Sequence, residues 1–229
     1  DHSCIYCYAS SYIRNFFKPR IKKNLLKKVQ SDIKKINKNL VVSMSNSSDP
    51  YQPLEKKLKL TRSCLRIFEQ ANIKILVVTK SDLVLRDIDI LKKMKASVSI
   101  SITTLNDRIS KKLEPNAPLP SKRLTATRKL VKNGIPVSMR FDPIILGIND
   151  KEMEEIIKSV AECGVSHVVS STYKVKYDNW LRMRETFPDV CKRLERLYFK
   201  DGEMISGYRY LPQPIRFKLM KKVRGLCDK

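Results

Sequence analysis

The chain has 229 residues, of which 42% are hydrophobic types, so it suits a folded domain and not a wholly disordered chain. Only 6 glycines and 11 prolines occur, which excludes collagen-like and low-complexity proteins. No uncharged apolar run is long enough to cross a bilayer, so we expect no contact with a membrane. The first residue is Asp1 and not Met, so we expect a piece of a longer protein.

The chain is strongly basic, with 47 Lys and Arg against 23 Asp and Glu and a net charge of +24. Such a charge favours polyanions such as nucleic acid, because counterions are released on binding. The lysines are also spread along the chain, as they are on ordinary solvated helix faces. Charge alone therefore leaves nucleic-acid binding open.

The hydrophobic pattern alternates between strands and amphipathic helices. Runs rich in β-branched residues predict strands at 40–44, 73–79, 97–103, 135–141 and 165–169. Helical periodicity predicts helices at 21–36, 60–71, 83–91, 121–132 and 150–160. From residue 173 onward we expect helices, with a break near 202–207 and a last helix at about 214–223. This order predicts βαβ units and a parallel sheet.

A further strand is expected just upstream of Asp1, because the cysteine-containing segment precedes a helix. The predicted fold is therefore α/β, an open partial (β/α)6 barrel of the TIM type that lacks its first strand here. We expect residues 1–200 to form the barrel and residues 201–229 to begin a truncated helical extension. Chemistry in such folds lies on the loops that follow the strands.

Cys4 and Cys7 are the only closely spaced pair among the six cysteines. The other four are isolated, which argues against a secreted disulfide framework and favours the cytoplasm. On spacing alone the pair is compatible with half a zinc site, a redox dithiol or part of an iron–sulfur site.

The surrounding residues resemble a known family. Residues 1–9 (DHSCIYCYA) resemble the end of the C-x-x-x-C-x-aromatic-C motif of the radical S-adenosylmethionine (SAM) superfamily, with the first cysteine expected immediately before Asp1. Other segments resemble its spore photoproduct lyase-like, or DNA repair photolyase-like, branch. They are 48–53 (SDPYQP), 79–81 (TKS), 85–87 (LRD), 99–103 (SISIT), 114–118 (EPNAP) and 143–150 (PIILGIND).

The resemblance implies a [4Fe–4S] cluster held by Cys4, Cys7 and a third cysteine outside the chain. It also implies SAM, whose reductive cleavage by an electron from an external donor yields a 5′-deoxyadenosyl radical. Five residues become candidates for contacts with SAM, which are Tyr6, Ser48, Lys80, Ser101 and Arg140. Four of them also have a structural alternative, which is a packed aromatic for Tyr6, a turn or cap for Ser48, a solvated lysine for Lys80 and an ion pair with Asp142 for Arg140.

Two positions bear on the reaction itself. Tyr8 follows the last cysteine, as does a tyrosine of spore photoproduct lyases that takes part in radical transfer. In those lyases, a cysteine two residues before the position matched by Ser48 returns the hydrogen atom. That position is Asn46 here, and an amide cannot donate a hydrogen atom in this way. Repair of spore photoproduct by the same route is therefore in doubt.

The resulting expectation is a radical SAM enzyme acting on DNA. Two alternatives stay open, which are a radical SAM reaction on another kind of substrate and a non-catalytic, metal-bearing nucleic-acid-binding module. Glu114 and Arg123 are expected to form a structural ion pair across the proline-containing loop. Tyr173, Tyr208 and Tyr210 are candidates for a base-stacking surface or, equally, for packing among the last helices.

Overall fold

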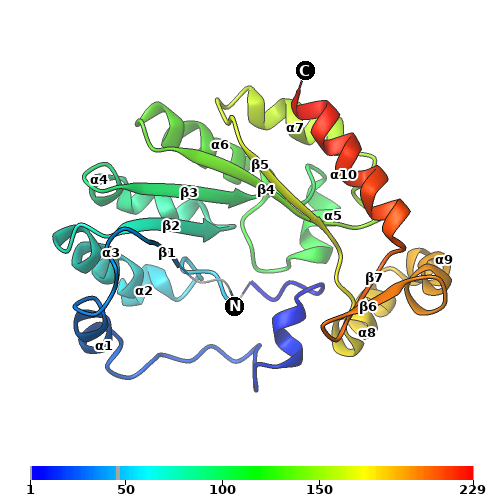
Figure 1. The fold of residues 1–229 in the computed structure, drawn as a ribbon, viewed down its shortest axis with the longest axis horizontal. Helices are drawn as coiled ribbons and strands as arrows, with labels where there is room; N and C mark the ends of the chain where they lie inside the picture. Colours follow the sequence, from blue (N-terminus) through cyan, green and yellow to red (C-terminus); the bar gives the residue numbers. More distant parts are fainter. Residues whose placement is uncertain (1, 45–46, 229) are drawn as a thin grey trace.

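The computed structural model describes residues 2–44 and 47–228. Five parallel strands form one sheet in the order β1-β2-β3-β4-β5, and the sheet curls into an open half-barrel (Figure 1). Consecutive strands are neighbours throughout, as repeated βαβ units require. The strands are β1 (Val41–Met44), β2 (Lys74–Thr79), β3 (Ala96–Ser101), β4 (Val137–Ile144) and β5 (Val168–Thr172).

Helices cover the convex face of the sheet and bury the core. In β2, Ile75 and Val77 alternate with half-buried residues, and in β3, Val98 and Ile100 alternate with serines; all four are almost fully buried. The last helix, α10, packs against β5 and against α7, the helix that precedes β5. The main helices on this face are α3 (Leu60–Gln70), α6 (Pro120–Lys132), α7 (Met153–Ala161) and α10 (Gln213–Cys227).

The N-terminal segment crosses the open side of the half-barrel before the first strand begins (Figure 1). It contains the short 3-10 helix η1 (Tyr8–Ser11) and the helix α1 (Leu25–Asp32), which packs on α3. The remaining helices are α2 (Glu55–Leu58), η2 (Asp82–Asp87), α4 (Ile88–Leu91), α5 (Asp107–Leu113), α8 (Tyr177–Thr186) and α9 (Pro188–Phe199).

The five predicted strands and the α/β class are confirmed, with shifted ends. The fifth strand covers Val168–Thr172 instead of 165–169, and the first helix is shorter than 21–36. The short helix α5 was not predicted, although Asn106 caps it by accepting hydrogen bonds from the N–H groups of Arg108 and Ile109.

Helices were expected from residue 173 onward with a break near 202–207, but that region forms strands, which were not predicted from the sequence. These form a hairpin of β6 (Glu203–Ile205) and β7 (Tyr208–Tyr210). The two residues between the strands, Ser206 and Gly207, both have positive φ, 50° and 74°. This is the backbone of the tight turns that join antiparallel strands, so turn chemistry outweighed helical periodicity here.

The sixth strand expected before Asp1 lies outside the described residues. The division of the chain near residue 200 also stays a prediction. None of the helices in the described ranges is long and apolar enough to span a membrane.

Candidate functional site

The cysteine loop, residues 2–7, is held by backbone and side-chain contacts at its two ends. The N–H of Cys7 donates to the carbonyl oxygen of Cys4 at 3.2 Å, which places both thiols on one turn. The N–H of Ile5 donates to the carbonyl oxygen of Leu113 at 3.0 Å, next to the loop that follows α5. These contacts hold the loop against the elements that follow β3.

Side chains of α8 hold the same loop from its other side. Arg182 donates to the carbonyl oxygens of Ile5 at 3.1 Å and Cys7 at 3.3 Å. Asn179, which is fully buried, donates to the carbonyl oxygen of Tyr6 at 3.1 Å. Asp178 accepts hydrogen bonds from Ser10 and Ser11 and pairs with Arg182 at 3.2 Å. A loop without regular structure thus has its backbone acceptors satisfied.

Beneath the loop lies a buried group of four side chains, which we call the Glu114 cluster. It consists of Tyr6, Thr103, Glu114 and Arg123. The Tyr6 hydroxyl donates to Glu114 Oε1, which also accepts from Thr103 at 3.0 Å. Arg123 approaches Glu114 Oε2 at 2.5 Å, so the expected ion pair is confirmed. Glu114 and Arg123 are each 1% exposed, and a buried charge needs such pairing.

Lys80 brings a positive charge from the end of β2 to this loop. Its ammonium lies 5.8 Å from the centre of the Tyr6 ring. Burial by itself lowers the pKa of Lys80, but Cys4 and Glu114 outweigh it and raise that pKa above its usual value. Burial raises the pKa of the Cys4 thiol to about 12, although Lys80 acts in the opposite direction. A partly buried cation therefore lies near a partly buried thiol.

Asp49 ties the loop after β1 to the end of β2. Its carboxylate accepts from the N–H of Tyr51 at 2.8 Å, from the Thr79 hydroxyl at 2.7 Å and from the N–H of Lys80 at 2.6 Å. His2 Nδ1 also lies 3.4 Å from it. Asp49 thereby positions the backbone of Lys80, a role that its place before a proline did not reveal.

The concave face of the sheet is polar toward the ends of β3, β4 and β5. Ser101 is the register partner of Arg140. Arg140 pairs with Asp142 at 3.2 Å, and Asp142 accepts from Ser171 at 2.6 Å. The serines at alternate positions of β3, Ser97, Ser99 and Ser101, indicate this polar face, because the side chains of a strand alternate between its two faces. This pattern was not among the predictions made from the sequence.

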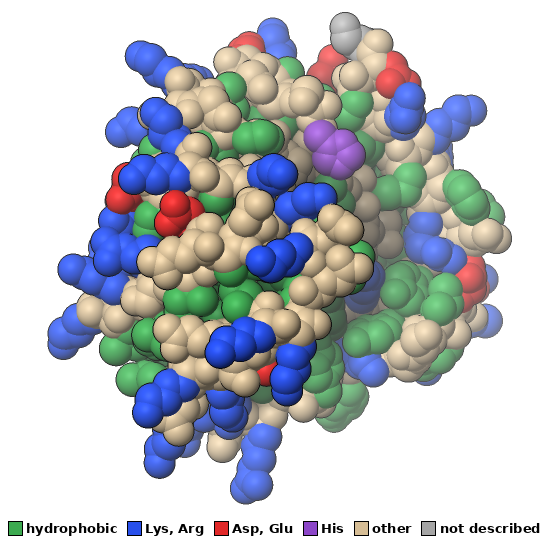
Figure 2. All heavy atoms as spheres, turned by 60° about the vertical axis from the view of Figure 1, so that its left-hand side comes forward, with side chains coloured by type: hydrophobic (Ala, Val, Ile, Leu, Met, Phe, Trp, Pro, Cys, Tyr) green, Lys and Arg blue, Asp and Glu red, His purple; other side chains and the backbone are tan. Residues whose placement is uncertain are grey.

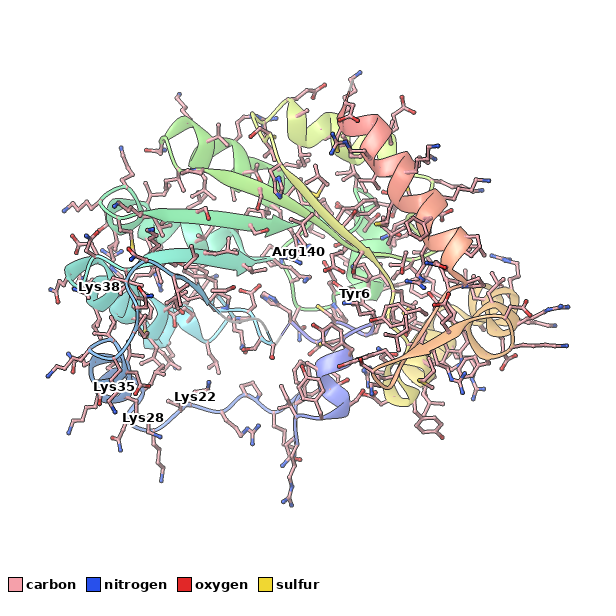
Figure 3. The ribbon with its side chains drawn as sticks, viewed as in Figure 1. Tyr6, Lys22, Lys28, Lys35, Lys38 and Arg140 are labelled. Carbon is pink, nitrogen blue, oxygen red and sulfur yellow. The ribbon has the colours of Figure 1, made fainter. Side chains whose placement is uncertain are left out.

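Two buried polar atoms on this face have no hydrogen-bond partner among the described residues, Ser99 Oγ and Arg140 Nε. Buried polar atoms are nearly always paired, so each exception calls for an explanation. A polar ligand in the mouth of the half-barrel would supply the missing partners. Arg140 lies on β4 and Tyr6 on the cysteine loop, as Figure 3 shows.

Tyr8 lies at the edge of the site, beside the hairpin. Its ring makes an edge-to-face contact with Tyr208 at 5.5 Å, and Lys174 lies 5.5 Å from its centre. Tyr8 is 36% exposed, whereas Tyr173 is 1% exposed and belongs to the core. Tyr173 is therefore excluded from the expected stacking surface, while Tyr208 is not.

The predicted site residues are brought together in part. Tyr6, Lys80, Cys4 and Cys7 meet at the cysteine loop, and Ser101 lies beside Arg140 on the concave face. Ser48 is exposed in the loop after β1. Asn46 lies outside the described residues. The roles of these residues toward a cofactor stay predictions.

The donor set fits part of an iron–sulfur site. Thiolates are the usual ligands of such clusters, and Cys4 and Cys7 share one turn. Within residues 2–44 and 47–228, no group of three or more His, Cys, Asp or Glu side chains could hold a metal ion. The described part of the chain therefore offers two thiolate ligands. Lys80 and the unpaired atoms of Ser99 and Arg140 fit a ligand that carries a carboxylate and hydroxyl groups.

Known relatives resemble this chain over most of its length. An uncharacterized protein of Methanocaldococcus jannaschii is 38% identical over 99% of this chain and 86% of its own. The radical SAM Nalpha-GlyT isomerase of Pseudomonas phage M6 is 24% identical, over 85% of this chain and 40% of its own.

A solved structure shares the fold. It is a variant of spore photoproduct lyase with bound AdoMet (SAM) and dinucleoside spore photoproduct, with a TM-score of 0.68 and 16% identity over 97% of this chain and 69% of that one. The family model "Radical SAM superfamily" matches residues 1–160, most of the sheet and the whole cysteine loop. The chain therefore belongs to the radical SAM superfamily.

Proposed function

We propose that this protein is an enzyme that cleaves SAM reductively and directs the resulting radical at DNA. The observation that carries the proposal is the meeting of the cysteine loop with Lys80 and the Glu114 cluster at the mouth of the half-barrel. Membership of the radical SAM superfamily supports the same reading.

Cys4 and Cys7 would hold a [4Fe–4S] cluster, with the third cysteine supplied from outside the described residues. Bound there, the cluster supplies the electron, received from an external donor, that cleaves SAM to methionine and a 5′-deoxyadenosyl radical. Lys80 would bind the methionine carboxylate, because a partly buried ammonium pairs well with an anion. Tyr6 would pack against the adenine, held in place by its hydrogen bond to Glu114.

Ser101 and Arg140 would bind the rest of the cofactor on the concave face. Ser48, in the loop after β1, would contact SAM from the opposite side of the mouth. Tyr8 would take part in hydrogen transfer, since it lies at the edge of the site in contact with Tyr208.

The DNA substrate is supported by two independent observations. The net charge of +24 attracts a polyanion. The structural neighbour was solved with a dinucleoside, which is a fragment of nucleic acid. Asn46 stands where the lyases carry a hydrogen-donating cysteine, so we expect either a different lesion or modification as substrate or a different hydrogen donor.

The first experiment tests the radical chemistry. The full-length protein is reconstituted with iron and sulfide without oxygen, given dithionite and SAM, and assayed for 5′-deoxyadenosine. Formation that is lost in Cys4→Ala and Cys7→Ala, and kept in the matched control Cys227→Ala, supports the proposal. Cys227 is an exposed free cysteine far along the chain. No product from a protein that carries a complete cluster, with DNA present, would favour the non-catalytic binding module.

A second experiment identifies the substrate class. DNA and peptides are prepared from cells grown in deuterated medium, and each is offered with unlabelled SAM; DNA is tested both with and without ultraviolet irradiation. A radical that abstracts from DNA carries deuterium into 5′-deoxyadenosine, which mass spectrometry detects. Deuterium from the peptides, and none from either DNA sample, would establish the alternative of a substrate other than nucleic acid.

A further inference from the structure

Residues 14–38 form a strongly basic segment, which we call the basic arm. It contains ten basic residues and a single acidic one, Asp32. All ten basic side chains are exposed to solvent. They are Arg14, Lys18, Arg20, Lys22, Lys23, Lys27, Lys28, Lys34, Lys35 and Lys38.

Packing of α1 decides where the charges on this helix point. Ile33, directly after the helix, is buried in the core, and Leu25, Leu26 and Val29 of the helix pack against the core. Because this apolar face is occupied by the contact with α3, Lys27 and Lys28 are left on the solvent side of the helix. The other eight basic residues of the arm flank α1 and are exposed as well. Lys22, Lys28, Lys35 and Lys38 lie together along one margin of the molecule, away from Tyr6 and Arg140 (Figure 3).

The charges of the basic arm are uncompensated. No ion pair involves any of its ten basic side chains within the described ranges, whereas Arg62, Arg86, Arg123 and Arg182 elsewhere all pair with carboxylates. Figure 2 shows Lys and Arg side chains spread over this side of the molecule with few acidic ones between them. Unpaired like charges repel each other, and a polyanion would relieve that repulsion.

We propose that the basic arm is a docking surface for the phosphate backbone of duplex DNA. The proposal rests on the proposed function and assigns the part of the molecule that holds the substrate's backbone. Lysines suit this role, because an ammonium on a flexible stem contacts phosphate as a point charge and reads no base. The eight residues of α1 span about 12 Å, along which a duplex presents about seven phosphates.

The same observations argue against a lipid surface. A helix that lies on a membrane needs a free apolar face to insert between the lipids. The apolar face of α1 is packed against the protein. Phe17 and Ile21 of the basic arm are exposed, but they lie outside α1 and belong to no helix that could insert its apolar face. The helix of the basic arm therefore presents charge without an apolar insertion face, which fits a phosphate backbone in water.

The test replaces four charges on the basic arm and four elsewhere. The arm variant is Lys22→Gln/Lys28→Gln/Lys35→Gln/Lys38→Gln. The matched control is Lys122→Gln/Lys129→Gln/Lys132→Gln/Lys158→Gln. These lysines are also exposed, but they lie on α6, which packs on β3 and β4, and on α7, both away from α1 (Figure 1). Circular dichroism checks that both variants are folded. Binding of a short unmodified DNA duplex is then followed by fluorescence anisotropy at several salt concentrations.

We expect the arm variant to bind on the order of a hundredfold more weakly near physiological salt, with a salt slope flatter by about three. The control should stay close to wild type. Equal losses in both variants would overturn the proposal, because the effect would then come from net charge alone. Unchanged binding in the arm variant would overturn it as well, while leaving the proposed radical chemistry intact.

Two further outcomes distinguish this proposal from the proposed enzyme activity and from lipid binding. Duplex binding needs no SAM cleavage, so a protein that forms no 5′-deoxyadenosine but binds DNA through the basic arm would refute only the proposed enzyme. Vesicles of phosphatidylcholine and phosphatidylserine serve as the other probe. If the arm variant loses binding to these vesicles and not to the duplex, the docking surface is for lipid and the proposal is wrong.

Discussion

The Glu114 cluster and the basic arm both contain charged residues, but in opposite surroundings. In the cluster, Glu114 and Arg123 are almost fully buried and paired with each other, and Glu114 also accepts hydrogen bonds from Tyr6 and Thr103. In the basic arm every lysine and arginine is exposed, and none has an ion-pair partner within the described ranges. Burial thus decides what a charge contributes. A buried charge holds the fold together, whereas an exposed charge is free for a partner.

The largest effect on stability should come from breaking the buried pair. Glu114→Gln leaves the Arg123 guanidinium buried without its carboxylate, so we expect a loss of about 3–5 kcal/mol in the free energy of unfolding. Urea denaturation measures it. Glu185→Gln, at an exposed position without an ion pair within the described ranges, should cost less than about 0.5 kcal/mol. Similar losses in the two variants would show that burial is not the deciding factor.

Asn149, a neutral buried residue, tests whether burial also decides the contribution of an uncharged polar group to stability. Asn149 is fully buried and donates to the carbonyl oxygens of Thr103 at 2.7 Å and Pro143 at 3.0 Å, which joins the loops after β3 and β4. Asn149→Ala should cost about 2–3 kcal/mol, because buried acceptors lose their partners. Asn133→Ala, which removes a single exposed contact to Lys129, should cost far less in the same urea titration. A small loss in the free energy of unfolding for Asn149→Ala would mean that burial decides the contribution of charged groups only.

Asp178 is partly buried, so its contribution to the free energy of unfolding should lie between those of the Glu114 cluster and the basic arm. Burial by itself raises its pKa, but hydrogen bonds from Ser10 and Ser11 and the charge of Arg182 outweigh it and lower that pKa. A lowered pKa stabilises the fold above the unfolded-state value of about 3.9, and this contribution is lost as the pH falls through the folded-state pKa.

We therefore expect Asp178→Asn to lose about 1 kcal/mol at pH 7, with the difference from wild type shrinking below about pH 4. Urea unfolding at a series of pH values measures this difference. Asp189→Asn is the control, since Asp189 is exposed and has no ion pair within the described ranges. A difference that grows toward acid pH would contradict the assignment.

The smallest effect on stability is expected for the basic arm. The arm variant removes four exposed charges, so its free energy of unfolding should stay within about 0.5 kcal/mol of wild type. At low salt a slight gain is expected, because repulsion within the arm is reduced. A loss of several kcal/mol by urea denaturation would mean that these lysines support the fold, and the contrast between the two regions would fail.

The elements of the sheet could be predicted because local patterns specify them. Runs such as residues 73–79 and 97–103 are rich in β-branched residues, and the strands lie there. The hairpin at 203–210 was missed because its decisive signal is a two-residue turn at Ser206 and Gly207, which is easily read as a helix break. The end of β5 was misplaced because periodicity locates boundaries poorly.

The site could be predicted only where a motif carries it. The spacing of Cys4, Tyr6 and Cys7 was readable, and so was the ion pair of Glu114 and Arg123. The sequence did not show that Tyr6 binds Glu114 or that Asp49 holds the backbone of Lys80. No local rule connects such residues, since the first two are 108 positions apart.

By itself, the sequence determined which local structures form, which family motif is present and how much positive charge the chain carries. These follow from the periodicity, spacing and number of residues. Only the tertiary structure decided which charges are buried in pairs and which stay free in water. That division depends on long-range packing, which places Glu114 beneath the cysteine loop and turns the apolar face of α1 inward, leaving its lysines outside.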